Sequence, residues 1–238
     1  MSRAGAKRLF LPALCLLGAV LFGALGVWQL ERLSWKRDLI ARVEARVAAA
    51  PALLPPRSAW DRLQPRNIEY RKLKLRGTFR HDHETLVDAL TERGPGYWVL
   101  TPLITSQGTV MVNRGFVPPD SKDPLSRQKG QLRGLVEVTG LARLPEPEGR
   151  FLRPNRPAAD RWYSRDIAAI AEARGLGAAA PFFVDADATP NPGGWPVGGM
   201  TVIRFRNTHL VYALTWFGLA ALCLGGLVFA LRSPNDAD

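Results

Sequence analysis

This 238-residue chain has three histidines, and their possible role as metal ligands is the most informative clue to its function. One of them, His209, stands at the start of a long apolar run. On a helix, Tyr212 and Trp216 would share a face with His209, because the three are spaced i, i+3 and i+7. A neutral imidazole offered at a membrane surface is a suitable axial ligand for haem iron, and aromatic rings beside it could pack on a porphyrin. The alternative is an interfacial histidine within the aromatic belt that borders membrane spans.

A second aromatic and basic cluster lies at the end of another apolar run, in the segment GVWQLERLSWK. Trp28, Arg32 and Trp35 would share one helix face at i, i+4 and i+7. We expect this cluster to lie at the same membrane depth as His209, where Arg32, Arg204 or Arg206 could pair with haem propionates. The alternative is ordinary Trp–Arg anchoring at the lipid boundary.

The other two histidines, His81 and His83, are two residues apart in a polar segment. If that segment is a strand, both side chains point to one face, as a pair of metal ligands would need. Asp82, Glu84 or Asp88 could then supply a further ligand. The alternative is a pair of solvated histidines in an exposed hairpin.

Sequence motifs of common enzymes are missing from the chain. It contains no G-x-S-x-G elbow, Walker A loop, dinucleotide fingerprint, C-x-x-C or H-E-x-x-H. Its two cysteines, Cys15 and Cys223, both fall inside apolar runs. The polar part therefore cannot be a thiol oxidoreductase or a cysteine-based copper carrier, and we expect a protein that is not an enzyme.

Two apolar runs of 22 residues, 9–30 and 210–231, carry no formal charge. Each is long enough to cross about 30 Å of hydrocarbon as a helix. A cleaved signal peptide would have a shorter apolar core, of about 7–15 residues. Small residues recur at four-residue spacing in both runs, which suits close helix packing in lipid, and the alternative is the ordinary glycine and alanine content of membrane helices. The small residues are Ala19 and Gly23 in the first run, and Ala221 and Gly225 in the second.

Two spans place both ends of the chain on one side of the membrane and residues 31–209 on the other. Basic residues without acids before the first span favour cytoplasmic tails, at 1–8 and 232–238. Only eight residues precede this span, which leaves no room for a mitochondrial presequence, so we expect a bacterial inner membrane and a periplasmic domain. This domain carries 28 Lys and Arg against 19 Asp and Glu. Such a charge suits anionic membrane lipid, and no nucleic-acid-binding fingerprint accompanies it.

The domain itself reads as α+β and mainly antiparallel β, with one or two helices. Residues 31–49 have a helical apolar stripe that continues the first span, and 165–174 read as a short helix. Gly94-Pro95-Gly96 predicts a turn, 120–131 a mobile polar loop and 190–199 a loop. The expected strands, from their apolar alternation, are 70–80, 84–90, 97–104, 109–117, 135–144, 182–185 and 201–206.

Some residues of the polar segments have local structural interpretations. Arg114 reads as a fixed donor, or as a structural partner of a carboxylate. Asn155 is expected to form a turn by bonding its own backbone. Trp162, Tyr163 and Asp166 are expected to pack against and cap the short helix.

Four segments, in order along the chain, resemble the surfeit locus protein 1 family. They are GVWQLERLSWK at 26–36, VNRGFVPP at 112–119, RPNRPAADRWYSRD at 153–166 and NTHLVYALTWFGLA at 207–220. The approach to the second span, GGWPVGGMTVIRFRNTHL, is similar to that family as well.

This resemblance implies an inner-membrane assembly factor for haem-copper cytochrome c oxidase, with a hairpin of two spans. It implies a role in bringing haem a, held transiently, to the large catalytic subunit, with other assembly factors or haem a synthase as further partners. The family's proposed haem ligand corresponds to His209. The alternative is a cofactor-free membrane scaffold that stabilises an assembly intermediate of the oxidase.

Overall fold

The computed structural model describes residues 3–150, 152–203, 205 and 207–232, with backbone alone at 3–9. Its chain divides into two compact units, one formed by residues 1–42 and 204–238 and the other by residues 43–203. The first unit contains the helix pair and the second contains the sheet.

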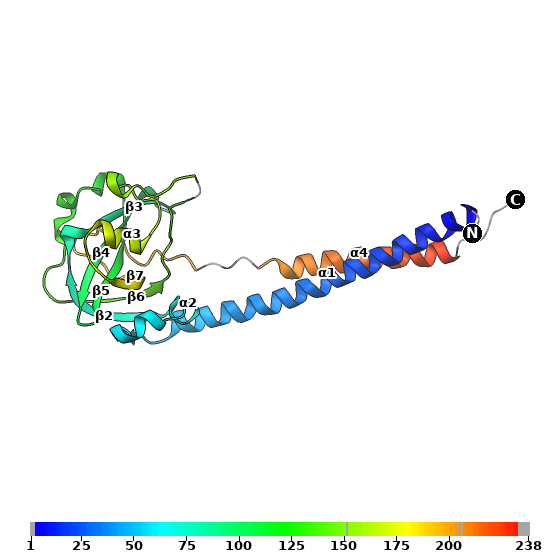
Figure 1. Ribbon diagram of the computed structural model, residues 1–238, viewed down its shortest axis with the longest axis horizontal. Helices are drawn as coiled ribbons and strands as arrows, with labels where there is room; N and C mark the ends of the chain where they lie inside the picture. Colours follow the sequence, from blue (N-terminus) through cyan, green and yellow to red (C-terminus); the bar gives the residue numbers. More distant parts are fainter. Residues whose placement is uncertain (1–2, 151, 204, 206, 233–238) are drawn as a thin grey trace. The chain divides into compact units, whose positions relative to one another are not determined.

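The helix pair consists of most of α1 (Arg3–Ala48) and all of α4 (His209–Arg232), which run side by side (Figure 1). Both helices are long and apolar enough to cross a membrane. Most of their large apolar side chains are exposed, among them Leu17, Val20, Leu214 and Leu222. A core helix of a water-soluble protein would bury such side chains, so the exposure suits contact with lipid. The expected helix at 31–49 is confirmed as a continuation of the first apolar run.

A seam of small and aromatic residues joins α1 to α4. A Cβ atom added to Gly26 would come within 2.5 Å of the Phe217 ring, so the glycine permits the close approach of the helices. Ala213 and Ala220 are buried in the seam. Their seven-residue separation matches two turns of a supercoiled helix, which keeps both on the contact face.

The sequence predicted only part of this seam. Ala19 is buried, as expected. Gly23 and Gly225, in contrast, have open space where a side chain would be, and Ala221 is exposed. Four-residue spacing therefore identified one of the four as a seam residue, because residues four apart share a broad helix face, whereas this narrow seam repeats every seven residues, as Ala213 and Ala220 do.

The domain contains a seven-stranded sheet in the order β1-β2-β6-β7-β5-β4-β3. A further antiparallel pairing, of Gly77, Thr78 and Phe79 in β2 with Thr105, Ile104 and Leu103 in β4, closes five of these strands into a barrel. Two pairings are parallel, β1 with β2 and β5 with β7. The others are antiparallel, so the predicted mainly antiparallel α+β domain is confirmed. The strands are β1 (Ala52–Leu53), β2 (Lys72–Phe79), β3 (Thr85–Thr91), β4 (Gly94–Thr105), β5 (Gly108–Val117), β6 (Val136–Arg143) and β7 (Ala179–Ala186).

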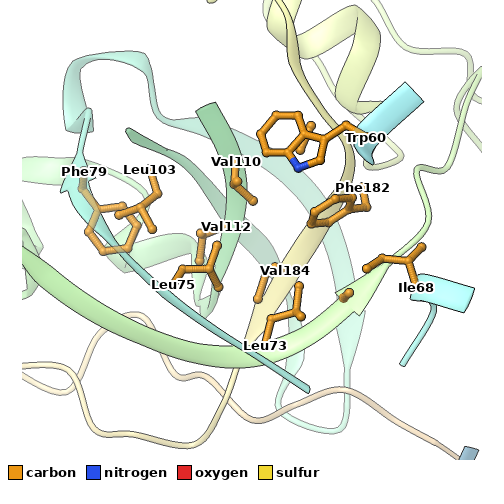
Figure 2. Packing of buried hydrophobic residues seen from close by; sticks show 12 residues of the cluster. Trp60, Ile68, Leu73, Leu75, Phe79, Leu103, Val110, Val112, Phe182 and Val184 are labelled. Carbon is orange, nitrogen blue, oxygen red and sulfur yellow. The ribbon is translucent and has the colours of Figure 1, made fainter. Parts of the chain in front are cut away.

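Alternating apolar residues fill the barrel. Figure 2 shows Leu73 and Leu75 of β2 converging with Val112 of β5 and Val184 of β7, with Trp60 beside Phe182. The two rings meet edge to face with centroids 6.0 Å apart. A second cluster packs α3 (Ile167–Ala173) on the outside of the sheet through Trp162, Ile167, Ile170 and Phe183.

Short helices connect the strands. They are η1 (Arg57–Arg62), α2 (Pro65–Ile68), η2 (His81–His83), η3 (Pro119–Ser121), η4 (Pro124–Gly130) and η5 (Pro157–Ala159). The residues 120–131, expected to form a mobile loop, instead form η3 and η4 over most of their length. The reason is Arg127, whose buried guanidinium makes an ion pair with Glu84.

Two further expectations were wrong. The turn expected at 94–96 lies at residues 92–93, because Gly94, Pro95 and Gly96 already pair with β3. The expected strand at 201–206 is not present in its described residues, 201–203 and 205, which have no regular structure. Apolar alternation was misleading there because no partner strand is available to residues 201–203. Arg204 and Arg206, two of the residues considered for propionates, lie outside the described part of the chain.

Candidate functional site

His209 is the first residue of α4, and its ring is held by the other helix. Its Nδ1 atom lies 2.8 Å from the amide oxygen Oε1 of Gln29, which is itself buried. This hydrogen bond places the two predicted clusters, one at Trp28 and Arg32 and the other at His209, at the same level of the helix pair. Gln29 was not among the residues predicted from the sequence. A polar residue at the end of an apolar run was the available signal, because polar groups within such helices generally find partners across the helix interface.

The aromatic residues around His209 divide into two kinds. Trp216 faces the seam and stacks on Phe22, with ring centroids 5.7 Å apart and planes 19° from parallel. Tyr212 and Trp28 are about half exposed, at 53% and 54%. These two rings are therefore available to lipid or to a flat ligand, whereas Trp216 already stabilises the helix pair.

Arg32 lies over the ring of Trp35, with its guanidinium carbon 4.2 Å from the ring centroid. This cation–π contact holds the side chain against its own helix while leaving the residue exposed. A guanidinium held in this way can still donate hydrogen bonds to a carboxylate. The end of the helix pair thus combines one imidazole, exposed aromatic rings and a basic group.

The domain contains a separate polar cluster around Asp185. This carboxylate is 4% exposed and lines a cavity of about 220 Å³. It accepts hydrogen bonds from Asn113 at 2.8 Å and Thr201 at 2.9 Å, and ion pairs at 3.2–3.3 Å join it to Arg165 and Arg143. Because these partners come from β5, β6, the segment just before α3 and the chain after β7, the cluster joins segments that are distant in the sequence.

Of the two interpretations of Arg114, the fixed donor is confirmed, and the carboxylate partner is not the contact that the structure shows. The buried guanidinium of Arg114 donates to the Gly130 carbonyl and to the Asn191 side chain, and lies 4.9 Å from the centroid of Phe79. Burial lowers the pKa of Arg114 to about 10, so the group stays charged at neutral pH. The neighbouring Gly115 lies at a tight point of the backbone, since an added Cβ would meet the Val197 carbonyl oxygen at 2.0 Å.

His81 and His83 do not lie on a strand, which removes the basis for a metal pair on one face. They belong to the 3-10 helix η2. His81 contacts the Leu132 carbonyl through Nε2, and burial lowers its pKa. His83 lies beside Asp82 and Arg80. Among the described residues, no group of three or more His, Cys, Asp or Glu side chains is arranged to hold a metal ion.

Residues 155–166 lead into α3, and three of them, Asn155, Trp162 and Asp166, hold this segment in place. Asn155 does not bond its own turn. Its Oδ1 atom accepts from the backbone N–H groups of Tyr163 and Ser164, which joins segments eight and nine residues apart. Asp166 caps α3, as predicted, by accepting from the Ala169 N–H group. Trp162 packs against that helix, also as predicted.

The amino-acid sequence matches one family of known proteins over most of its length. The model of the SURF1 family matches residues 16–221, which include most of both apolar helices and the whole sheet domain. The chain is 41% identical to mouse Surfeit locus protein 1 over 225 residues, covering 87% of this chain and 71% of the mouse protein.

Other relatives have similar identity to this chain and similar coverage of it. Human Surfeit locus protein 1 is 40% identical over 230 residues, covering 89% of this chain and 74% of the human protein. A SURF1-like protein of Monosiga brevicollis is 37% identical over 239 residues, covering 94% of this chain and 88% of that protein. The match extends over both apolar helices and the barrel domain, so the chain belongs to the SURF1 family.

Proposed function

We propose that this chain is a membrane-anchored assembly factor for haem-copper cytochrome c oxidase that handles haem a at the His209 end of its helix pair. Membership of the SURF1 family supports the role in oxidase assembly. The haem-handling part depends on one observation: a histidine at the start of an apolar helix has one ring nitrogen held by Gln29, and exposed aromatic rings lie on the same helices.

The residues present fit a haem as cargo. A neutral imidazole with its Nδ1 atom engaged keeps Nε2 as a ligand for iron. Trp28 and Tyr212 expose ring surface for a porphyrin, and Arg32 offers a donor for a propionate. Trp216 contributes indirectly, through the helix pairing that holds His209 in place. A single axial ligand suits a carrier, because a carrier must release what it holds.

The partners and location follow from the same proposal. The large catalytic subunit of the oxidase would receive the haem, and haem a synthase or other assembly factors would act before it. The chain would lie in a bacterial inner membrane, with cytoplasmic tails at 1–8 and 232–238 and a periplasmic domain at 31–209. Spans at 9–30 and 210–231 are supported by the two apolar helices. The protein would transfer its cargo without catalysing a reaction.

The test is an absorption spectrum of the protein purified in detergent from cells that make haem a, with pyridine extraction to identify the haem. We expect a haem a signal in the wild type and its loss in His209→Ala. His83→Ala is the matched control, because it removes a histidine of the domain and should keep the wild-type signal. Equal haem content in wild type and His209→Ala would reject the ligand assignment. A colourless wild type that copurifies with the oxidase would favour the cofactor-free scaffold instead.

A further inference from the structure

Gln29 is a buried amide in an otherwise apolar contact between two helices. Gln29 as a whole is 9% exposed, and the neighbouring seam positions, Gly26 and Ala213, are apolar. Burying an amide away from water costs free energy unless the amide is hydrogen-bonded. The hydrogen bond to His209 therefore restrains the ring as well as the amide, because separating the two would leave a buried polar group without a partner, which costs free energy.

The Gln29 atom that contacts His209 determines which ring nitrogen of the histidine carries the proton. The contact at 2.8 Å is made by Oε1 of Gln29, and an amide oxygen can only accept. Nδ1 must then carry the proton. A neutral imidazole has one N–H group and one lone pair, so the lone pair lies on Nε2. Nε2 is thus left as the nitrogen that can bind a metal.

We propose that Gln29 is the positioning residue for His209, which fixes the ring in its Nδ1–H form and presets Nε2 as the ligand atom. Histidines that bind metals generally donate their other ring N–H to an acceptor, which orients the ring and raises its basicity. The part of this inference that concerns haem rests on the proposed function. The part that concerns the tautomer does not, because it follows from the helix pair alone.

A merely structural role for Gln29 makes different predictions. If the amide only held the helices together, its loss would loosen α1 from α4 without altering the electronic character of a bound iron. If it positions the ligand, a stronger acceptor at residue 29 donates more charge through the imidazole and stabilises the oxidised iron. The midpoint potential of bound haem therefore separates the two roles.

The first measurement is the ¹⁵N spectrum of histidine-labelled full-length protein, free of haem, in detergent. The His209 signals are identified by their loss in His209→Gln. We expect a protonated Nδ1 and an unprotonated Nε2. The opposite tautomer, with the proton on Nε2, would overturn the inference, because the amide would then donate to Nδ1 and the ligand nitrogen would be blocked.

The second measurement uses protein loaded with haem and three variants. Gln29→Leu removes the acceptor, and we expect about 10- to 100-fold weaker haem binding and a higher midpoint potential. Gln29→Glu keeps an acceptor, and we expect retained binding with a lower potential. Gly18→Leu is the packing control, because a Cβ there would meet Cys223 Sγ at 2.9 Å in a part of the seam away from His209. It should disturb helix pairing without moving the potential.

The outcomes separate this inference from the proposed function. Haem retained by His209→Ala rejects the proposed ligand, whatever the tautomer. Haem lost from His209→Ala, together with unchanged potentials in both Gln29 variants, rejects the positioning role alone. Potentials that shift in opposite directions in Gln29→Leu and Gln29→Glu, with none in Gly18→Leu, support both.

Discussion

The ion pair between Arg127 and Glu84 is buried almost completely, with side chains 1% and 5% exposed. Removing one partner leaves the other charge without compensation away from water, which typically costs about 3–5 kcal/mol. We expect Arg127→Met to lower the free energy of unfolding of the domain by that amount. Thermal unfolding of the purified protein, followed by circular dichroism in the β-sheet region, would measure it.

An exposed ion pair serves as the control. Nη2 of Arg80 lies 2.7 Å from Oδ2 of Asp82, but the two side chains are 47% and 60% exposed. Water screens such pairs, so Arg80→Met should leave the unfolding transition unchanged. Equal losses in Arg80→Met and Arg127→Met would show that burial does not determine the strength of these pairs in this domain.

Glu146 makes the domain sensitive to acid. Burial raises the pKa of its carboxyl, but hydrogen bonds and attraction from Arg165 outweigh burial and hold the pKa below its ordinary value. A carboxyl with a lowered pKa binds fewer protons in the folded state, so the stability it contributes is present above the ordinary pKa, about 4.3, and is lost as pH falls below it. Thermal unfolding between about pH 6 and pH 3 should therefore show a smaller acid-induced loss in Glu146→Gln than in wild type. The exposed Glu172 of α3 is the control, and Glu172→Gln should follow wild type.

At the scale of the elements, the helix seam allows a direct test of register. A Cβ at residue 18 would lie 3.8 Å from Cβ of Cys223, which is close to the mean separation of about 3.8 Å in disulfides. We expect Gly18→Cys, with Cys15→Ala, to form a disulfide with Cys223 on mild oxidation. After proteolysis within residues 43–203, the two helix fragments should stay joined on a non-reducing gel.

Gly23→Cys is the matched control, since nothing lies within 4 Å of a Cβ at that position. It belongs to the same helix and the same apolar run, so its thiol meets the same oxidant. Crosslinking of Gly23→Cys at the rate of Gly18→Cys would contradict the seam described above. The two glycines thus test which face of α1 contacts α4.

The strands also show which features of the fold could be predicted from the sequence and which could not. Expected strands such as 109–117 and 135–144 are confirmed, because apolar alternation reports burial on one face of a sheet. Alternation does not report pairing partners, so the parallel contact of β5 with β7 was not predicted. At the candidate site, His209 could be singled out from its position in the sequence, whereas its contact with Gln29 could not. The two residues are 180 positions apart, and only the antiparallel helix register joins them.

For the whole molecule, the testable property is topology. If both apolar helices cross the membrane, the two chain ends share one side and the domain lies on the other. In a Cys15→Ala/Cys223→Ala background, we expect Leu125→Cys, at an exposed position of η4, to react with an impermeant maleimide in bacterial cells whose outer membrane is permeabilised. Ser2→Cys and Asp236→Cys should react only after lysis of the inner membrane. Labelling of Ser2→Cys in unlysed cells would reject the proposed orientation.

The central place of β7 in the sheet has a consequence for how the protein is made. Strands β5 and β6 both pair with β7, and the contact between Asn113 and Asp185 spans 72 positions of the chain. A nascent chain therefore reaches β6 with two strands that have open edges, and it cannot complete the barrel until residues 179–186 have been synthesised and released from the ribosome. By then α4 is close behind in synthesis. Barrel closure and insertion of the last helix thus fall in the same short period of biogenesis, and a chain that stops before residue 179 keeps its open edges, which favour aggregation.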